Sequence, residues 1–212
     1  MIEQAETLDQ NGRVLGPRAL KTRARLLAAT ESQLCRQSVR ELSVVEITRE
    51  AGTSPATCYQ YFGDVTDAVL LLAEHVSATT AAALAEVGDE WTGEAGLENA
   101  RTMVNALLDI WEEHRPLLLA RNVMADEGDE RFHVVRRNSV GAMIGRLATR
   151  LREIRRADAL PQEIHSGVAA IALVTMVERI AAYSFELSQY GMSRETLAET
   201  CARIVHDGMA RS

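Results

Sequence analysis

Residues 51–64 read AGTSPATCYQYFGD, and this stretch decides the fold. Gly52 is suited to the left-handed backbone conformation that stops a helix and turns the chain. Ser54, or Thr53 beside it, is suited to N-cap a following helix. Pro55 fits the first turn of that helix, because no backbone N–H is needed there. The stretch therefore predicts the end of one helix, a short turn and the start of another.

Two more helices are predicted upstream. Ser43 is placed to cap a short helix in VVEITREAG (residues 44–52), with Glu46 at the capping-box distance. Residues 17–36 are amphipathic, since apolar and small residues recur at three- and four-residue steps, at Leu20, Ala24, Leu27 and Leu34. A helix, a turn that contains Gly and a second helix together indicate a helix-turn-helix.

The helix predicted over residues 54–62 carries two kinds of side chain. At 3.6 residues per turn, Cys58 and Phe62 fall on one face, which we expect to pack on the core with Ile47 and Leu27. Polar and aromatic groups are left on the outer face. A helix of this kind can enter the DNA major groove, about 12 Å wide, where hydroxyl, amide and ring groups suit phosphate oxygens, base edges and thymine methyl groups.

The charge of the chain is unevenly distributed. The net charge is −7, yet residues 13–63 carry eight basic residues against four acidic ones. Residues 64–212 carry fifteen Arg against twenty-three acidic residues. A basic region on an acidic body can bind phosphates locally while the body keeps the protein soluble.

Composition favours a soluble, all-helical protein. Of 212 residues, 47% are hydrophobic and 25% charged, and only four are Pro, which leaves long stretches free to be helical. Three widely spaced Cys form no disulfide framework and suggest a reducing cytoplasm. The N-terminus lacks an apolar run, so we expect no signal peptide. The longest uncharged apolar stretch, residues 166–177, is too short to span a bilayer, so we expect no membrane partner.

Catalytic and metal-binding motifs are missing from the sequence. The five His, at positions 75, 114, 133, 165 and 206, lie far apart and have no metal-ligand spacing. No GxSxG motif and no Gly-rich phosphate loop occurs. We therefore expect no enzyme, no metal site and no cofactor.

Several motifs together resemble the DNA-binding domain of TetR-family transcriptional regulators: Val44-x-x-Ile47, Ala51-Gly52-x-Ser54, Thr57-x-Tyr59-x-Tyr61-Phe62 and the apolar helix after them. The upstream LLAAT with Leu34 is similar to that family's first helix, and the match covers about residues 18–75. The resemblance implies an all-α homodimer with an N-terminal three-helix helix-turn-helix domain and a C-terminal helical bundle for ligand binding and dimerisation. The expected division is a flexible arm (1–16), the DNA-binding domain (17–63) and the ligand-binding and dimerisation domain (64–212).

The resemblance also implies DNA contacts. Those to bases are expected from Pro55, Ala56 and Tyr59, and those to phosphates from Ser43, Thr57, Gln60 and Tyr61; the cap Ser54 and the flanking Arg18 and Lys21 complete the DNA-binding set. For Tyr59 and Tyr61 the alternative is packing within the small domain. Cys58 is expected to be a buried, inert thiol.

The chain departs from the family pattern at three places. Thr48 replaces an Ala, QSVREL (residues 37–42) replaces a Gly-containing turn, and Val65 replaces a Lys that reaches a phosphate. Loss of one phosphate contact is expected to weaken binding and lower its salt slope by about one. Candidates to compensate are Arg13, Arg18, Lys21, Arg23 and Arg25, whose alternative role is to form a solvated helix face.

Beyond the head, long helices are predicted. Asp64 caps one that runs to about Gly88, and others follow at 97–113, 116–125, 131–156, 162–190 and 193–209. The helix 162–190 is apolar on nearly all sides in its middle, so we expect helices 162–190 and 193–209 to form a homodimer interface. The Arg-rich stripe of the helix 131–156 is expected to be a solvated face or to form intersubunit ion pairs, and its alternative role is to bind nucleic acid. The stripe consists of Arg146, Arg150, Arg152, Arg155 and Arg156.

An apolar ligand pocket is expected in the body. The candidates are Met103, Leu107, Trp111, Met124, Met143, Met176, Tyr183 and Phe185, with Asn105 and Glu178 as polar anchors. The alternative for the apolar residues is core packing, and for Glu178 an interface ion pair beside Arg179.

The expected function is a ligand-responsive, sequence-specific regulator in the bacterial cytoplasm, located at the nucleoid when it is bound to operator DNA. A repressor released by an apolar small molecule is the leading form, and an activator is the other. The alternative is a helical ligand-binding protein of the same fold that has lost DNA binding, an alternative motivated by Val65 and the modest basic excess.

Overall fold

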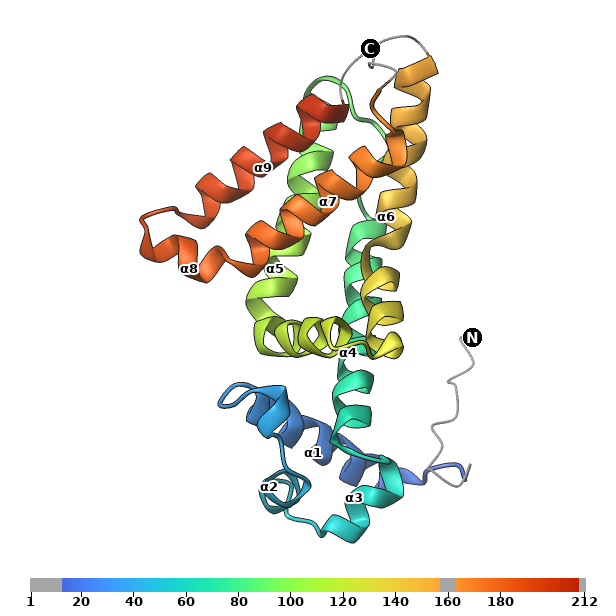
Figure 1. Cartoon of the computed structure of the whole chain (residues 1–212), viewed down its shortest axis with the longest axis vertical. Coiled ribbons are helices and arrows are strands. Elements are labelled where there is room, and N and C mark those ends of the chain that lie inside the picture. Colours follow the sequence, from blue (N-terminus) through green and yellow to red (C-terminus); the bar gives the residue numbers. More distant parts are fainter. Residues whose placement is uncertain (1–12, 157–162, 210–212) are drawn as a thin grey trace. The chain divides into compact units, whose positions relative to one another are not determined.

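The computed structural model describes residues 13–156 and 163–209 of the chain, and all regular secondary structure in these residues is helical (Figure 1). This confirms the predicted all-α fold. The elements are α1 (Pro17–Leu34), a short 3-10 helix η1 (Val39–Glu41), α2 (Val44–Glu50), α3 (Pro55–Tyr61), α4 (Val65–Ala85), α5 (Gly93–Asp126), α6 (Glu130–Arg156), α7 (Ser166–Ala182), α8 (Ser184–Gln189) and α9 (Arg194–Met209). Residues 17–63 are called the head below.

Side-chain caps determine where α2 and α3 begin. The Ser43 hydroxyl accepts a hydrogen bond from the Val45 N–H (3.3 Å), and the Ser54 hydroxyl accepts one from the Thr57 N–H (3.2 Å). Pro55 is the first residue of α3. Both predicted caps are confirmed, and Ser54 is the cap of α3.

The turns of the head follow from their sequence. Gly52 has φ +62°, a conformation in which a side chain is strained, so the chain reverses between α2 and α3. The predicted capping box at Glu46 is wrong, because the Glu46 carboxylate accepts a hydrogen bond from the Gln37 amide instead (3.2 Å). A capping box does occur in QSVREL, between Ser38 and Glu41, where it starts η1.

One hydrophobic cluster holds α1, α2, α3 and the start of α4 together. Cys58 and Phe62 face inward from α3 and its end, as predicted, and the whole cluster is Leu26, Ala29, Ile47, Ala51, Cys58, Phe62 and Ala68. The predicted buried face of α1 is shifted, since Leu26 is fully buried, Leu27 packs at the edge and Leu20 is 41% exposed. Leu26 and Leu27 are adjacent and fit the helical period almost equally well. The period alone therefore does not predict which of the two is buried.

Packing contacts divide the chain into two compact units. The first unit comprises Met1–His75 and Pro116–His133, and the second comprises Val76–Arg115 and Val134–Ser212. The three junctions between the units, at residues 75/76, 115/116 and 133/134, fall inside helices, so α4, α5 and α6 each have residues in both units. The functional division at residue 63 stays a prediction.

Within the first unit, ion pairs attach segment 116–133 to the N-terminal helices. Arg40, in η1, pairs with Glu127, just after α5. Arg131, in α6, pairs with Asp67 at the start of α4 (2.9 Å) and with Asp129 (2.7 Å). These hydrogen-bonded partners raise the pKa of Arg131, so the guanidinium stays charged. Elements far apart in sequence thus form one unit.

Two helix predictions for the body have different outcomes. The predicted break between helices 97–113 and 116–125 is confirmed as a kink inside α5, where two helices meet at the non-helical His114 (φ −117°, ψ 21°), although the first of them begins at Gly93. Pro116 lacks the N–H that would close the preceding turn, so its effect is a kink rather than an end. The predicted helix 162–190 is two helices, α7 and α8, broken at Tyr183 (φ −101°, ψ 7°). Its predicted first residue, Gln162, lies outside the described residues.

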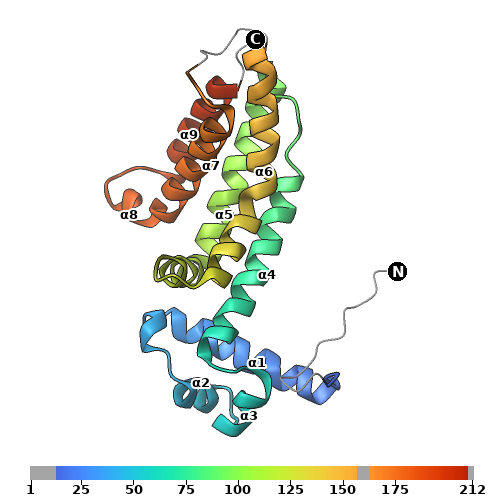
Figure 2. The same cartoon turned by 45° about the vertical axis from the view of Figure 1, so that its right-hand side comes forward.

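In the second unit, α7 and α9 lie side by side (Figures 1 and 2). Arg101 on α5 holds Glu199 on α9 (2.9 Å). Arg146 on α6 donates to the Leu84 carbonyl at the end of α4 (3.3 Å) and pairs with Asp89 (2.7 Å). The first residue of the Arg-rich stripe therefore has an intrachain structural role.

α4 has the length and hydropathy of a membrane-crossing helix, and it is the one such helix in the described part of the chain. α4 contains Asp67 and Glu74, so it is not an uncharged stretch like residues 166–177. Along α4, Ala68, Val69 and Ala73 are buried in the first unit, and Val76 and Leu84 are buried in the second. This burial is typical of a helix in a protein core.

We expect Phe62→Ala to lower the free energy of unfolding of the head by about 3–5 kcal/mol, because a cavity replaces a ring that is only 3% exposed. Trp91 and Trp111 lie in the second unit, so amide hydrogen exchange across α1–α3, rather than fluorescence, measures the loss. Tyr59→Ala removes a ring that is 54% exposed and is the control. Unchanged exchange in Phe62→Ala would contradict the core assignment.

Candidate nucleic-acid interface

The outer surface of α3 carries most of the residues predicted to contact DNA. Ser54, Pro55, Ala56, Tyr59 and Gln60 are exposed, whereas Thr57 and Tyr61 are half-buried. Because Cys58 and Phe62 hold the opposite side of this segment in the core, the exposed residues project together from one short, fixed helix. Their roles toward DNA stay predictions.

Tyr61 has a structural role as well. Its ring packs against the core cluster and lies 6.4 Å from the Phe62 ring, between centroids. The alternative stated for Tyr61, packing within the small domain, therefore applies at least in part. Tyr59 is different, since 54% of it is exposed and the core cluster does not include it.

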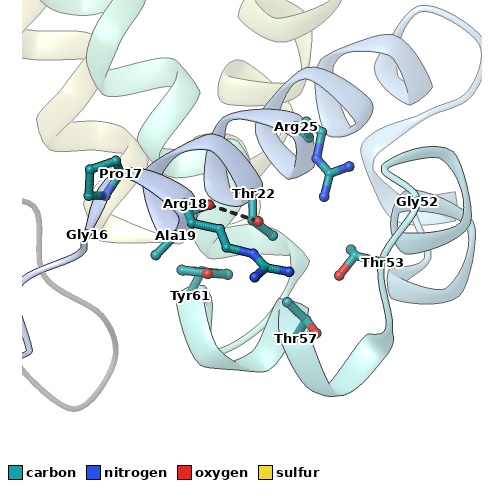
Figure 3. Close-up of a pocket in the computed structure, with 10 residues that line it drawn as sticks. All are labelled: Gly16, Pro17, Arg18, Ala19, Thr22, Arg25, Gly52, Thr53, Thr57 and Tyr61. Atoms are coloured by element: carbon teal, nitrogen blue, oxygen red, sulfur yellow. Dashed lines mark hydrogen bonds between the residues drawn. The ribbon is translucent and has the colours of Figure 1, made fainter.

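A groove lies between the N-terminal half of α1 and the turn that leads into α3 (Figure 3). It is lined by Gly16, Pro17, Arg18, Ala19, Thr22, Arg25, Gly52, Thr53, Thr57 and Tyr61. Of the predicted DNA-binding residues, Arg18, Thr57 and Tyr61 meet here. Lys21 is exposed on α1 and Ser43 caps α2, and neither lines this groove. Sequence reasoning missed Thr22 and Thr53, because only the fold brings them together.

The departures from the family pattern have structural explanations. Val65, the first residue of α4, is partly buried against the core cluster, so it strengthens the head and offers no cation. Thr48 is 1% exposed, and its hydroxyl donates to the Val44 carbonyl (2.7 Å). A hydroxyl in the place of an Ala methyl is therefore satisfied inside α2 itself.

The thiols differ in exposure. Cys58 and Cys201 are buried, and this burial raises the pKa of both, whereas Cys35 is exposed. A buried thiol with a raised pKa holds little of the reactive thiolate at neutral pH, which agrees with the expected inert role of Cys58. The described residues contain no group of three or more side chains suited to hold a metal ion.

Most residues predicted to bind a ligand lie in the second unit. Met103, Leu107, Trp111 and Met143 are buried there, as core packing alone would also place them. Met176 and Glu178 are half-buried, and Met124 belongs to the first unit. These positions leave the ligand-binding role a prediction.

Three of the predicted pocket residues have other surroundings. Asn105 accepts a hydrogen bond from Arg194 (3.0 Å) and donates to the Arg101 carbonyl (3.0 Å), so its amide is already engaged between α5 and α9. Phe185 is 61% exposed, with the guanidinium of Arg115 5.7 Å from its ring centroid. Tyr183 is 47% exposed. In the single chain, Phe185 and Tyr183 lie at the surface rather than inside the bundle.

A second concave region, in the second unit, contains none of the predicted ligand residues. It is lined by Asp89, Trp91, Ala142, Gly145, Arg146, Thr149, Arg150 and Glu153. Trp91 is 2% exposed, and the Arg146 guanidinium donates a hydrogen bond to the Leu84 carbonyl at the end of α4. The loop after α4 and one face of α6 meet here. No local sequence pattern predicts that these two segments lie together.

A helix-turn-helix head followed along the chain by a helical body is an architecture found in DNA-binding regulators. Residues 83–212 match the family model described as "Tetracyclin repressor-like, C-terminal domain". This match spans more than half of the chain, and the chain belongs to the TetR family of transcriptional regulators. Regulators of this family bind operator DNA, typically dimerise and are generally non-enzymatic.

Solved structures share the fold. A transcriptional regulator from Rhodococcus sp. Rha1 is 19% identical with a TM-score of 0.67, over 88% of this chain and 95% of that one. The TetR-family regulator PfmR from Thermus thermophilus is 19% identical with a TM-score of 0.59, over 89% and 98%. The fatty acid degradation regulator FadR from Bacillus halodurans is 14% identical with a TM-score of 0.60, over 92% and 95%. No curated protein sequence gives a significant match.

We expect a maleimide to label Cys35 rapidly in the native protein and to label Cys58 and Cys201 only on unfolding, since their thiols are buried and their pKa is raised. Peptide mapping by mass spectrometry after timed labelling measures this order. Cys35→Ser is the control and should abolish the rapid phase. Rapid labelling of Cys58 would contradict its place in the core of the head.

Proposed function

We propose that the chain is a ligand-responsive, sequence-specific DNA-binding regulator, and that it acts as a repressor which an apolar small molecule releases from its operator. The observation that best supports this proposal is the orientation of α3. One side of this helix is anchored in the core, and its other side exposes Ser54, Pro55, Ala56, Tyr59 and Gln60. A fixed helix with a polar and aromatic outer face fits a major groove. The protein would act in the bacterial cytoplasm, at the nucleoid when bound to DNA.

Within this proposal the exposed residues have different tasks. Pro55, Ala56 and Tyr59 read base edges and thymine methyl groups, while Thr57 and Gln60 contact phosphates. Tyr59 supports this division best, because its large ring is 54% exposed on a seven-residue helix and lies outside the core cluster of the head.

A homodimer supplies the second head. The outward side of α7 exposes Val168 (63%) and Ile171 (48%), and neighbouring α9 exposes Ile204 (46%). These apolar side chains on adjacent helices suit burial against a second copy through the regions predicted, 162–190 and 193–209. Two heads related by a two-fold axis read half-sites about 34–36 Å apart, or a multiple of that spacing.

An effector would act by differential affinity. A ligand that binds more tightly to the conformation unsuited to the operator shifts the population off DNA. The buried Met and Trp side chains of the second unit, Met103, Trp111 and Met143, suit an apolar effector. Equal operator affinity with and without a bound effector would contradict this part of the proposal.

A second candidate function is a ligand-binding protein of the same fold without DNA binding. The observation that favours it is Val65, which packs into the core where a phosphate-binding cation is expected from the family pattern. Sequence-specific retention of DNA at physiological salt would exclude this candidate.

The testing experiment is a selection of genomic fragments on the purified protein, followed by titration of the best fragment at two salt concentrations. An enriched pseudo-palindrome supports the dimeric regulator, and its position in the genome distinguishes repression from activation. Weak retention without sequence preference supports the second candidate.

We expect Tyr59→Ala to reduce discrimination between the operator and a mismatched duplex by about 1–3 kcal/mol, since a base contact is lost. Thr57→Ala should weaken binding to both duplexes more evenly, because a phosphate contact carries no sequence information. Fluorescence anisotropy with the two duplexes measures both effects, and Tyr59→Phe separates the ring from its hydroxyl. If neither Ala variant changes operator affinity, α3 is not the recognition helix.

We expect Val168→Glu to raise the dimer dissociation constant roughly 30-fold or more, because an unpaired charge buried in an interface costs about 2–5 kcal/mol. Sedimentation velocity over a concentration series measures the shift. Val45→Glu is a matched control, since Val45 on α2 is also 63% exposed but lies in the head. If both variants change the dimer dissociation constant equally, the dimer contact does not include Val168.

A further inference from the structure

We propose that the groove between α1 and the turn before α3 binds one backbone phosphodiester of the operator, with Arg25 and Arg18 as its cations. This inference rests on the proposed DNA-binding function and assigns part of it to a second site, separate from the outer face of α3. Of the five basic residues expected to compensate for Val65, only Arg18 and Arg25 line this groove. Figure 3 shows both side chains reaching from α1 toward the segment that carries Thr53 and Thr57.

The helical register puts the two arginines on the same face. They are seven residues apart, which is close to two turns, so both project from one side of α1. Across the groove, the chain runs from Gly52 to Tyr61. Gly52 has φ +62°, and a Cβ built on it would meet only the Arg25 Nη1, at 4.0 Å. The turn therefore keeps open the space beside the Arg25 guanidinium.

The charge in the groove is uncompensated. Within the described residues, neither the Arg18 nor the Arg25 side chain forms an ion pair or hydrogen bond, and the groove lining contains no acidic residue. Three other arginines of the first unit do form ion pairs: Arg36 with Glu50, Arg40 with Glu127 and Arg131 with Asp67. Two unpaired guanidinium groups facing one cleft suit an anion, and their planar forks suit a phosphate.

Hydroxyl groups complete the site. Thr53 has no hydrogen-bond partner for its side chain among the described residues, and it lines the groove opposite Arg25. The Thr57 hydroxyl lies 2.9 Å from that of Ser54, and either can be the donor; when Ser54 donates, the Thr57 O–H can donate to a phosphate at the groove edge. A phosphodiester bears two oxygens that accept from such donors.

The shape of the groove favours a polymer over a free anion. The site is an open cleft on the surface of the head rather than an enclosed cavity. A free phosphate there would stay hydrated and be weakly held, whereas a DNA strand is already positioned by α3, whose Thr57 and Tyr61 line the same cleft. The occupant is therefore the sugar-phosphate backbone.

The test is the salt dependence of DNA binding by Arg25→Gln. We expect affinity for the operator and for an unrelated duplex to fall by the same factor, and the slope of log affinity against log salt to decrease in magnitude. The decrease should reach about 0.9, the contribution of one phosphate, in the double variant Arg18→Gln/Arg25→Gln, which removes both cations of the groove. Arg25→Lys should restore most of the slope, because it keeps the charge. Arg152→Gln removes the same charge from an exposed site on α6 and should leave both quantities unchanged.

Each outcome separates the inference from the proposed function. Wild-type protein that retains the operator, with an unchanged slope in Arg25→Gln and helicity preserved, would overturn the inference and leave the function standing. Wild-type protein that retains no DNA would overturn both. Inorganic phosphate that protects the Arg25 guanidinium from a dicarbonyl reagent at millimolar concentration, as well as operator DNA does, would point to a free-anion site and overturn the assignment to DNA.

Discussion

The head depends on one constraint: two seven-residue helices must be held by packing. Helices as short as α2 and α3 do not form alone in water, because nucleation costs more than so few hydrogen bonds return. Ile47, Cys58 and Phe62 meet Leu26 from α1 and supply the stabilisation. The same packing fixes which residues of α3 face outward, so the core of the head also determines its binding surface.

Local chemistry explains why the head was predictable. Ser43, Gly52, Ser54 and Pro55 each have one favoured place at a helix end, and the structure uses all four as expected. The body offers fewer such signals. No Gly or Pro marks the break at Tyr183, and tertiary packing selected Leu26 over Leu27. The groove residues Thr22 and Thr53 lie thirty-one positions apart, so only the folded chain brings them to one site.

The two compact units do not coincide with a division of the chain at one point. Segment 116–133 belongs with the N-terminal helices and is tied to them by Arg40–Glu127 and Arg131–Asp67. The helices α4, α5 and α6 each have residues in both units. The kink at His114 lies next to one of these crossings.

The exposed side chains of α3 also bear on how such a protein diverges. Pro55, Ala56, Tyr59 and Gln60 stand outside the core cluster, so substitutions at Ala56, Tyr59 or Gln60 carry little folding cost. Under the proposed function, a duplicated gene can therefore acquire a new DNA preference by a few changes at these positions while it keeps a stable head. The phosphate contact proposed for the groove around Arg18 and Arg25 would then be inherited unchanged, since a backbone contact serves every sequence equally.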